Sequence, residues 1–156
     1  MKFLKIYVAS SWRNFHQPDV VIALRRDGHT VYDFRNPGPE NIGFQWSEID
    51  PKWKSWSLGE YAKALDHPIA QAGYNLDMRG LVGADLCVLV LPSGRSASWE
   101  YGYHNALTRR SGIVYCPEKV EPELMYRGSR FVSTLADLVA VTREYADACR
   151  LVEDFR

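Results

Sequence analysis

The residues best suited to chemistry lie in segment 86–102, which reads LCVLVLPSGRSASWEYG. Its first part is apolar and partly β-branched, which predicts a strand buried on both faces of a parallel sheet. A short polar turn ends this strand, and either Ser96 or Ser98 is a plausible N-cap for the helix that follows. Either cap places Glu100 near the start of the helix, where the helix dipole favours an ionised carboxylate. Because ligands of open α/β sheets bind outside the carboxyl ends of the strands, Glu100 is the leading candidate for a catalytic residue.

The rest of the chain alternates between strand-like and helix-like segments, and these segments must position Glu100. Strands are expected at 3–9, 30–34, 86–91, 113–116 and 131–133. Helices are expected at 18–27, 57–65, 68–81, 98–110, 121–126 and 134–152. The alternation predicts an α/β fold: a three-layer, doubly wound, flavodoxin- or Rossmann-like domain around a mostly parallel sheet of about five strands.

Segment 35–58 interrupts the alternation with prolines and with Phe44, Trp46, Trp53 and Trp56. We expect one domain over residues 1–156, with this segment as an aromatic-rich insertion. A long insertion without obvious secondary structure is more often functional than idle. Its aromatic rings can form a pocket wall or lid that stacks on a planar base, or they can simply pin a surface loop in place.

The composition excludes several classes of protein. The 156 residues include 19 basic and 19 acidic side chains without a basic stripe, so nucleic acid is not an expected partner. No stretch is long and apolar enough for a membrane span, and the first residues lack the features of a signal peptide. Cys87, Cys116 and Cys149 are widely spaced, which indicates reduced, structural cysteines in a cytoplasmic protein. We expect no metal and no cofactor.

The order of three motifs resembles the nucleoside 2-deoxyribosyltransferase superfamily, which includes the nucleoside 5′-monophosphate N-glycosidases. The first motif is the strand ending in Ile6-Tyr7-Val8-Ala9-Ser10, and the second is the helix that carries Asn75-Leu76-Asp77. The third is the Ala84-Asp85 strand followed by a small-residue loop and Glu100-Tyr101-Gly102. The resemblance covers most of the chain outside the insertion.

The resemblance implies a role for three side chains. Glu100 matches the nucleophile that attacks the anomeric carbon and forms a glycosyl-enzyme intermediate, chemistry for which a carboxylate is competent. Asp77 matches the acid that holds the leaving base or positions the sugar, and a raised pKa would let it donate a proton. From the residue pattern alone, Asp77 can equally be a surface side chain. Tyr7 matches the tyrosine that orients the nucleophile. Asp85 is expected only to hydrogen-bond at the start of its strand.

The loops around the same edge supply groups that can hold a substrate. Hydroxyls, backbone N–H groups and arginines can cradle a phosphate at a helix N-terminus, which favours a nucleotide over a free nucleoside. In many relatives the first loop contains a glycine, whereas here it reads Ser-Ser-Trp-Arg-Asn. The expected substrate-binding residues are Ser10, Ser11, Arg13, Ser93, Gly94, Ser96, Ser98 and Trp46.

Two other functions are open at this point. TIR domains share this general architecture and cleave the nicotinamide glycosidic bond of NAD, and the run Ser96 to Glu100 loosely suits them. A non-catalytic nucleotide-binding module is the other alternative. The resemblance further implies a homo-oligomer, a dimer or larger, with the active site near a subunit interface. The partner that we expect is therefore a small nucleoside or nucleotide.

Overall fold

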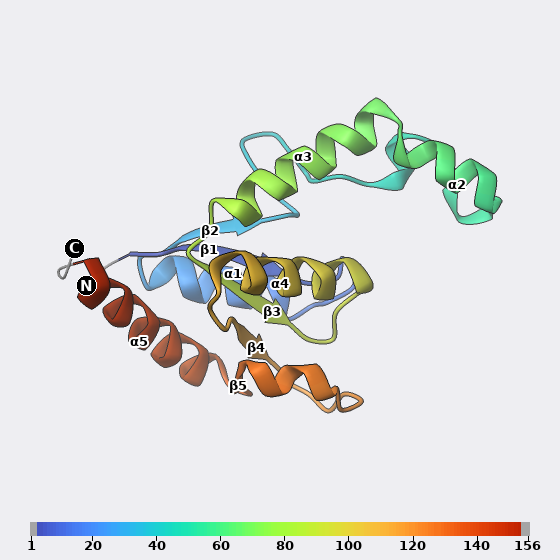
Figure 1. Cartoon of the computed structure of the whole chain (residues 1–156). Helices are drawn as coiled ribbons and strands as arrows, with labels where there is room; N and C mark the ends of the chain where they lie inside the picture. The colour runs from blue at the N-terminus through green and yellow to red at the C-terminus, as the bar shows by residue number, and fades with distance from the viewer. Residues whose placement is uncertain (1–2, 154–156) are drawn as a thin grey trace.

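The computed structural model of the chain describes residues 3–153. These residues form an α/β fold around a five-stranded sheet with the order β2-β1-β3-β4-β5, in which each pair of neighbouring strands is parallel (Figure 1). The predicted flavodoxin-like sheet is confirmed. The strands are β1 (Lys5–Ala9), β2 (Thr30–Asp33), β3 (Leu86–Val90), β4 (Ile113–Tyr115) and β5 (Arg130–Val132).

Helices cover both faces of the sheet (Figure 1). Apolar residues of α1 and α5 pack on one face, and residues of α3 and α4 pack on the other. The α-helices are α1 (Gln17–Arg26), α2 (Leu58–Leu65), α3 (Pro68–Val82), α4 (Arg95–Thr108) and α5 (Leu135–Glu153). Three 3-10 helices accompany them: η1 (Trp46–Glu48), η2 (Trp53–Ser55) and η3 (Leu124–Gly128). None of the helices within the described range is long and apolar enough to cross a membrane.

The central position of β3 in the sheet explains why its sequence shows no alternation of polar and apolar residues. All five of its residues are fully buried. Its side chains alternate between the two cores, with Val88 facing α1 and α5 and with Leu89 facing α3 and α4. Both faces of β3 therefore need apolar residues, as is usual for the centre of a parallel sheet.

Helix α4 begins three residues earlier than predicted. Its N-cap is Gly94, whose carbonyl oxygen accepts the first helical hydrogen bond from the Ser98 amide at 3.2 Å. The prediction of Ser96 or Ser98 as the N-cap is therefore wrong. Both serines lie within the first helical turn, where a serine is tolerated. The predicted helix at 121–126 is also displaced, because this part of the chain forms the 3-10 helix η3.

The aromatic insertion leads into a projecting arm, which we define as residues 44–70. The arm contains η1, η2, α2 and the start of α3, and α2 lies well away from the sheet (Figure 1). Trp46 is its centre, with edge-to-face contacts to Phe44 at 4.8 Å and to Trp56 and Tyr61 at 5.8 Å between ring centroids. The insertion therefore has more regular structure than expected and is held together by its own rings.

Candidate active site

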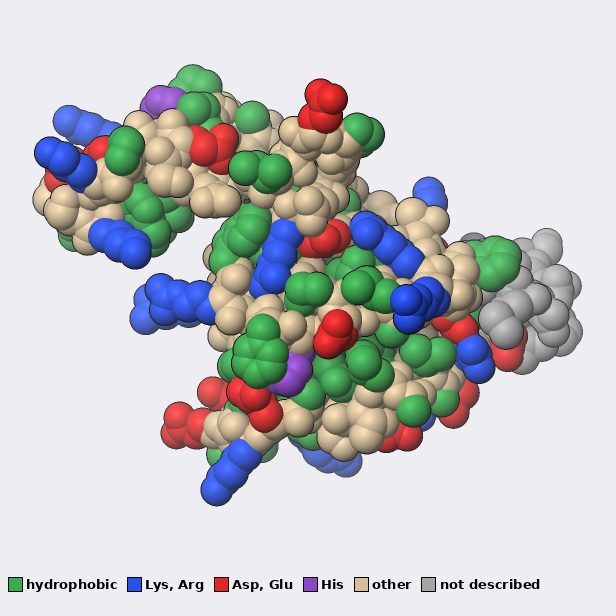
Figure 2. Space-filling view, turned by 180° about the vertical axis from the view of Figure 1, so that it is seen from behind, with side chains coloured by type: hydrophobic (Ala, Val, Ile, Leu, Met, Phe, Trp, Pro, Cys, Tyr) green, Lys and Arg blue, Asp and Glu red, His purple; other side chains and the backbone are tan. Residues whose placement is uncertain are grey.

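A cavity of about 960 Å³ lies at the carboxyl edge of the sheet. Its lining comes from the loops after β1 and β2, from the arm, and from α3 and α4. Figure 2 shows a recess between the arm and the body of the protein on one side of the molecule. The three predicted catalytic side chains, Tyr7, Asp77 and Glu100, all line this cavity, although they come from three separate elements.

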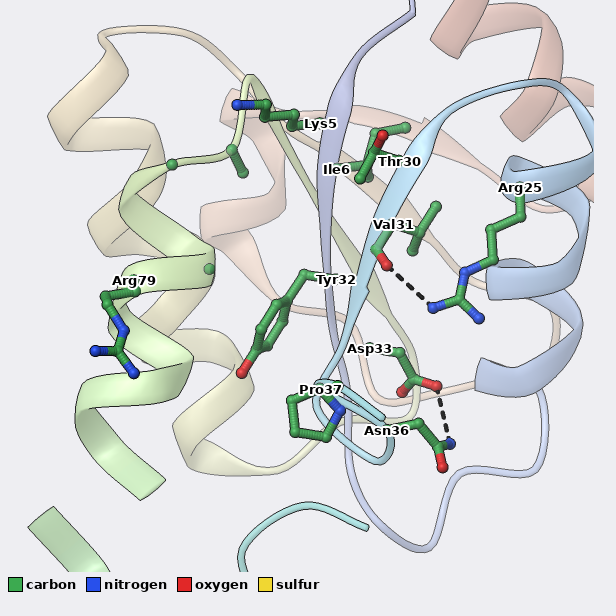
Figure 3. Close-up of a pocket in the computed structure, with 14 residues that line it drawn as sticks. Lys5, Ile6, Arg25, Thr30, Val31, Tyr32, Asp33, Asn36, Pro37 and Arg79 are labelled. Carbon is green, nitrogen blue, oxygen red and sulfur yellow. Dashed lines mark hydrogen bonds between the residues drawn. The ribbon is translucent and has the colours of Figure 1, made fainter. Parts of the chain in front are cut away.

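Tyr7 and Asp77 are connected through Tyr32. Tyr7 and Tyr32 are partners in the parallel register of β1 and β2, and their rings stack with centroids 5.1 Å apart and planes 9° apart. The Tyr32 hydroxyl donates a hydrogen bond of 2.8 Å to Oδ1 of Asp77. Figure 3 shows the Tyr32 side chain between strand β2 and helix α3. The edge strand of the sheet thus fixes the carboxylate of a helix.

Gly80 has no side chain, and this leaves room for the Tyr32 ring to pack against α3. A Cβ atom on Gly80 would lie only 2.5 Å from Cδ2 of Tyr32. Gly80 is one turn after Asp77 on the same helix, so the ring that covers Gly80 reaches the Asp77 carboxylate with its hydroxyl.

Glu100 is the sixth residue of α4, in its second turn, and it is mostly buried. Burial and the charge of Asp77 raise its pKa to about 8, while the neighbouring Tyr7 hydroxyl opposes the rise. The expectation that the helix dipole keeps Glu100 ionised is therefore wrong. The dipole acts within the first turn, whereas desolvation and a nearby like charge both favour the protonated acid.

Asp77 also has a raised pKa, because its carboxyl is largely buried. The hydrogen bond from Tyr32 lowers that pKa and so limits the rise. Since the ionised Asp77 disfavours the ionisation of Glu100, the two groups behave as one coupled pair. Burial and the charge of Asp77 therefore favour Glu100, with its pKa of about 8, as the protonated member of the pair at neutral pH.

The hydroxyl of Tyr7 is fully buried beside these carboxyls. No hydrogen bond within residues 3–153 satisfies this hydroxyl. Burial, together with the negative charges of Glu100 and Asp77, raises the pKa of Tyr7 far above its usual value. Tyr7 is therefore a neutral hydrogen-bond donor at the bottom of the cavity.

The loop after β1, residues 10–14, forms one wall of the cavity. Ser10, Ser11 and Arg13 line the cavity here, and Arg95 and Ser96 at the start of α4 line it as well. The Ser10 hydroxyl donates to the carbonyl oxygen of Val90 at 3.0 Å, so this side chain also ties the loop to β3. Hydroxyls and two guanidinium groups are thus available to an anionic part of a ligand.

Three predicted substrate-binding residues do not line the cavity: Ser93, Gly94 and Ser98. The Ser93 and Ser98 hydroxyls lie beside the hydroxyl of Tyr126 and oppose the rise that burial causes in its pKa. Gly94 is the N-cap of α4. The Ser93 and Ser98 hydroxyls are thus directed toward Tyr126 of η3 rather than into the cavity.

The opposite wall of the cavity is aromatic. Trp46 lines it, as predicted, together with Phe44, Trp53, Tyr61 and Tyr74. The insertion therefore forms a pocket wall, which was the first of its two interpretations. Lys54 lies over the ring of Trp53, 5.7 Å from its centroid, and adds a positive charge to the same wall.

Sequence reasoning missed Tyr32 and the neighbours of Asp77 on α3. The cavity-lining residues of α3 follow the spacing of one helix face, namely Ala70, Gly73, Tyr74, Asp77, Met78 and Leu81. This helical spacing can be recognised in the sequence. The contact between Tyr32 and Asp77 cannot be predicted from the sequence, because it depends on how β2 packs against α3.

Two polar residues near this edge have structural roles. Asp85 accepts a hydrogen bond of 2.8 Å from the Lys5 amide, as expected for the start of its strand. His104 is buried, with Nε2 3.1 Å from the carbonyl oxygen of Ala84. Nowhere in residues 3–153 do three His, Cys, Asp or Glu side chains form a group that can hold a metal ion.

The fold of this chain is similar to that of one known enzyme. A scan of the sequence against protein-family models finds no match, and a search of curated proteins finds none. Among solved structures, the chain is similar to a 2-deoxyribosyltransferase from the psychrotolerant bacterium Bacillus psychrosaccharolyticus. The TM-score is 0.54 at 20% sequence identity, over 86% of this chain and 89% of that chain. This chain thus has the fold of that enzyme, in agreement with the resemblance seen in the sequence.

Proposed function

We propose that this protein cleaves or transfers at the N-glycosidic bond of a nucleoside or nucleotide, with Glu100 as the nucleophile. The observation that carries the proposal is the position of Glu100, Asp77 and Tyr7 in one cavity at the carboxyl edge of the sheet. The shared fold with a 2-deoxyribosyltransferase supports membership of the same superfamily. A carboxylate nucleophile beside a second carboxyl group suits a retaining, two-step glycosyl transfer.

The first step uses the single proton of the carboxyl pair. When a substrate occupies the cavity, that proton moves from Glu100 to Asp77, and Glu100 becomes the ionised nucleophile. The Glu100 carboxylate attacks the anomeric carbon while the bond to the base nitrogen breaks, and Asp77 donates its proton to the departing base. The products are a neutral base and a glycosyl ester of Glu100, with Asp77 ionised.

The second step releases the sugar. Asp77, now a carboxylate, accepts a proton from water as the water oxygen attacks the anomeric carbon, and Glu100 leaves as a carboxylate. If a second base attacks instead, Asp77 accepts its proton and the product is a new N-glycoside. The Tyr7 hydroxyl has no hydrogen-bond partner within the described residues and lies beside Glu100, so it is free to donate to the Glu100 carboxylate and orient it once Glu100 ionises.

A nucleotide suits the cavity better than a free nucleoside. Ser10, Ser11 and Arg13 line one side together with Arg95 and Ser96, a set of groups suited to a phosphate. The aromatic wall around Trp46 offers faces and edges against which a planar base can pack. The two walls thus match the two ends of a nucleoside monophosphate.

The deciding experiment measures free base by chromatography after incubation with nucleosides, nucleoside monophosphates and NAD. Wild type, Glu100→Ala and the matched surface variant Glu144→Ala are run side by side. We expect base release by wild type and Glu144→Ala and none by Glu100→Ala. Glu144 suits the control because it is an exposed residue whose ion-pair partner within residues 3–153 is the exposed Arg130. Equal turnover by Glu100→Ala would exclude this residue as the nucleophile.

Other outcomes of the same experiment identify the alternatives. Release of nicotinamide from NAD without activity on nucleotides would assign the protein to TIR-like NAD cleavage. A nucleotide that raises the melting temperature without any base release would indicate a binding module. Adding an acceptor base separates hydrolysis from transfer, because only a transferase then forms a new N-glycoside.

We also propose that the protein is a homo-oligomer, as the resemblance implies. Trp99 and Tyr103 on α4 stack at 5.1 Å and are substantially exposed, as is Leu107 one turn later. Such an apolar stripe beside a ligand site is typical of a subunit interface. Light scattering gives the test, since a monomer at micromolar concentration would contradict the proposal.

A further inference from the structure

One guanidinium group holds most of the loop after β1. Nη2 of Arg35 donates to three carbonyl oxygens of that loop, those of Ser11 at 2.9 Å, Trp12 at 3.1 Å and Asn14 at 2.7 Å. Arg35 belongs to the start of the aromatic insertion, far from this loop in the sequence. It does not line the cavity, whereas Ser11 and Trp12 do. Arg35 therefore supports the loop from behind.

The surroundings of Arg35 fix its guanidinium in place. The group lies 5.8 Å from the ring centroid of Trp12 and 5.7 Å from that of Phe34. These two rings meet edge to face at 5.3 Å. The Arg35 amide donates to Oδ1 of Asp33 at 3.0 Å, and Asp33 also accepts from Gln17 at 2.8 Å. The guanidinium that holds the loop thus lies against the Trp12 and Phe34 rings, and Asp33 holds the backbone of Arg35.

The loop is tied on its other side to strand β3. Nδ2 of Asn14 donates to the carbonyl oxygens of Val90 at 3.1 Å and Pro92 at 2.9 Å. The Ser10 hydroxyl donates to the same Val90 oxygen. These acceptors stand at the end of the strand that leads to Glu100. The loop therefore bridges the nucleophile's strand and Arg35.

The direction of the carbonyl groups decides where the N–H groups point. In a trans peptide, the C=O and the following N–H point in opposite directions. Because Arg35 binds the Ser11 and Trp12 carbonyls, the amides of Trp12 and Arg13 point away from Arg35. The Arg13 amide donates to the Ser11 hydroxyl at 3.2 Å. Within residues 3–153 the Trp12 amide has no hydrogen-bond acceptor, and Trp12 is one of the residues that line the cavity.

We propose that Arg35 is a positioning residue that holds loop 10–14 in its ligand-binding conformation. The inference rests on the proposed function for its kinetic consequence, but the loop geometry stands apart from it. Arg35 presents N–H groups in a planar fork that also stacks on aromatic rings, whereas a lysine is a compact point charge. Arg35→Lys therefore keeps the positive charge but loses the hydrogen bonds to the loop carbonyls and the contact with the aromatic rings.

The test compares Arg35→Lys with the matched variant Arg25→Lys. Arg25 also donates to a backbone carbonyl, that of Val31 in β2 at 3.1 Å, but it lines a separate cavity of about 460 Å³ (Figure 3). We expect hydrogen exchange in residues 10–14 to become about tenfold faster in Arg35→Lys only. We also expect KM for a nucleoside monophosphate to rise about tenfold while kcat stays near the wild-type value.

Several results would overturn the proposed role of Arg35. Unchanged exchange and unchanged KM in Arg35→Lys would overturn the inference, as would faster exchange spread over the whole sheet. Equal losses of melting temperature in both variants with wild-type KM would reduce Arg35 to a structural residue. If wild type releases no base from any substrate, the proposed function fails, and exchange in residues 10–14 alone decides on Arg35. Should Arg35→Lys not fold, Arg35→Gln, which keeps a planar N–H donor, is measured in the same way.

Discussion

The hydroxyl of Tyr32 donates a hydrogen bond of 2.8 Å to the carboxylate of Asp77 and so joins the edge strand β2 to helix α3. The ring of Tyr32 stacks on Tyr7, whose hydroxyl lies beside Glu100. Two tyrosines on neighbouring strands thus lie beside the two carboxyl groups of the cavity. The geometry of the proposed active site depends on this contact between sheet and helix.

Replacing Gly80 by alanine should disturb the site from outside the cavity. The new Cβ would lie 2.5 Å from the Tyr32 ring, so the ring must move and its hydrogen bond to Asp77 must break. We expect a loss of about 1–3 kcal/mol in the free energy of unfolding and at least a tenfold loss in kcat/KM. Gly102→Ala is the control, since nothing lies within 4 Å of its Cβ position and an alanine favours the helix. Denaturant unfolding and steady-state kinetics measure both effects.

Removing only the Tyr32 hydroxyl should raise the pKa of Asp77. The hydrogen bond from Tyr32 favours the ionised carboxylate, so Tyr32→Phe removes a lowering influence and leaves burial unopposed. We expect a stability cost of about 1–3 kcal/mol from the loss of this hydrogen bond to a buried carboxyl group. A carbon-13 titration of the Asp77 carboxyl measures the pKa directly. Tyr103→Phe, on the outer face of α4, should leave this titration unchanged, and a lowered Asp77 pKa in Tyr32→Phe would contradict the assignment.

The rate of base release should follow a bell-shaped pH profile. The proposed reaction needs one proton on the carboxyl pair, and the pair loses that proton as the pH rises through about 8, the pKa of Glu100. We therefore expect kcat/KM to fall above pH 8. With a 4-nitrophenyl glycoside of the same sugar phosphate, whose leaving group departs as an anion without accepting a proton, the fall above pH 8 should disappear. Identical profiles for both substrates would show that proton donation is not part of the slow step.

Glu100→Gln should make the protein more stable at alkaline pH. The folded state raises the pKa of Glu100 from 4.5 to about 8, so its favourable contribution is full below pH 4.5 and is lost as the pH rises to 8. Glutamine resembles the protonated acid and has no such loss. We expect no gain in melting temperature near pH 4 and a gain on the order of 5–10 °C at pH 8. Scanning calorimetry across this range, with Glu144→Gln as the control, measures the difference. A constant gain at all pH values would contradict the raised pKa.

Truncating Trp46 should weaken substrate binding more than chemistry. Trp46 lines the cavity and is surrounded by Phe44, Trp56 and Tyr61. Loss of base stacking costs about 1–3 kcal/mol, so KM should rise about 10–100-fold in Trp46→Ala with kcat little changed. Trp46→Phe keeps an aromatic ring and should retain most of the binding. An unchanged KM in Trp46→Ala would show that the aromatic wall does not contribute to substrate binding.

Local sequence patterns predicted the elements well, because those patterns reflect local physics. The unbroken apolar run at β3 predicted a doubly buried strand, and the helix predicted at 18–27 matches α1, whose C-cap is Asp27 and which is followed by Gly28 with φ +95°. The Ser57 cap of α2 was also readable, and its hydroxyl accepts from the Glu60 amide. The start of α4 was not predicted correctly, because glycine and serine both serve as N-caps and the turn geometry decides which of them does so here.

The sequence by itself determined that parallel strands bring Tyr7, the loop after β1 and Glu100 to one edge, since that follows from chain order and strand direction. Only the tertiary structure decided the ionisation of the site. The pKa of about 8 at Glu100 comes from burial and from Asp77, a residue of another helix. Likewise, Tyr32 reaches Asp77 and Arg35 reaches the loop only because β2 packs beside α3 and the first loop. Desolvation and contacts between distant segments depend on packing, and no short stretch of sequence encodes them alone.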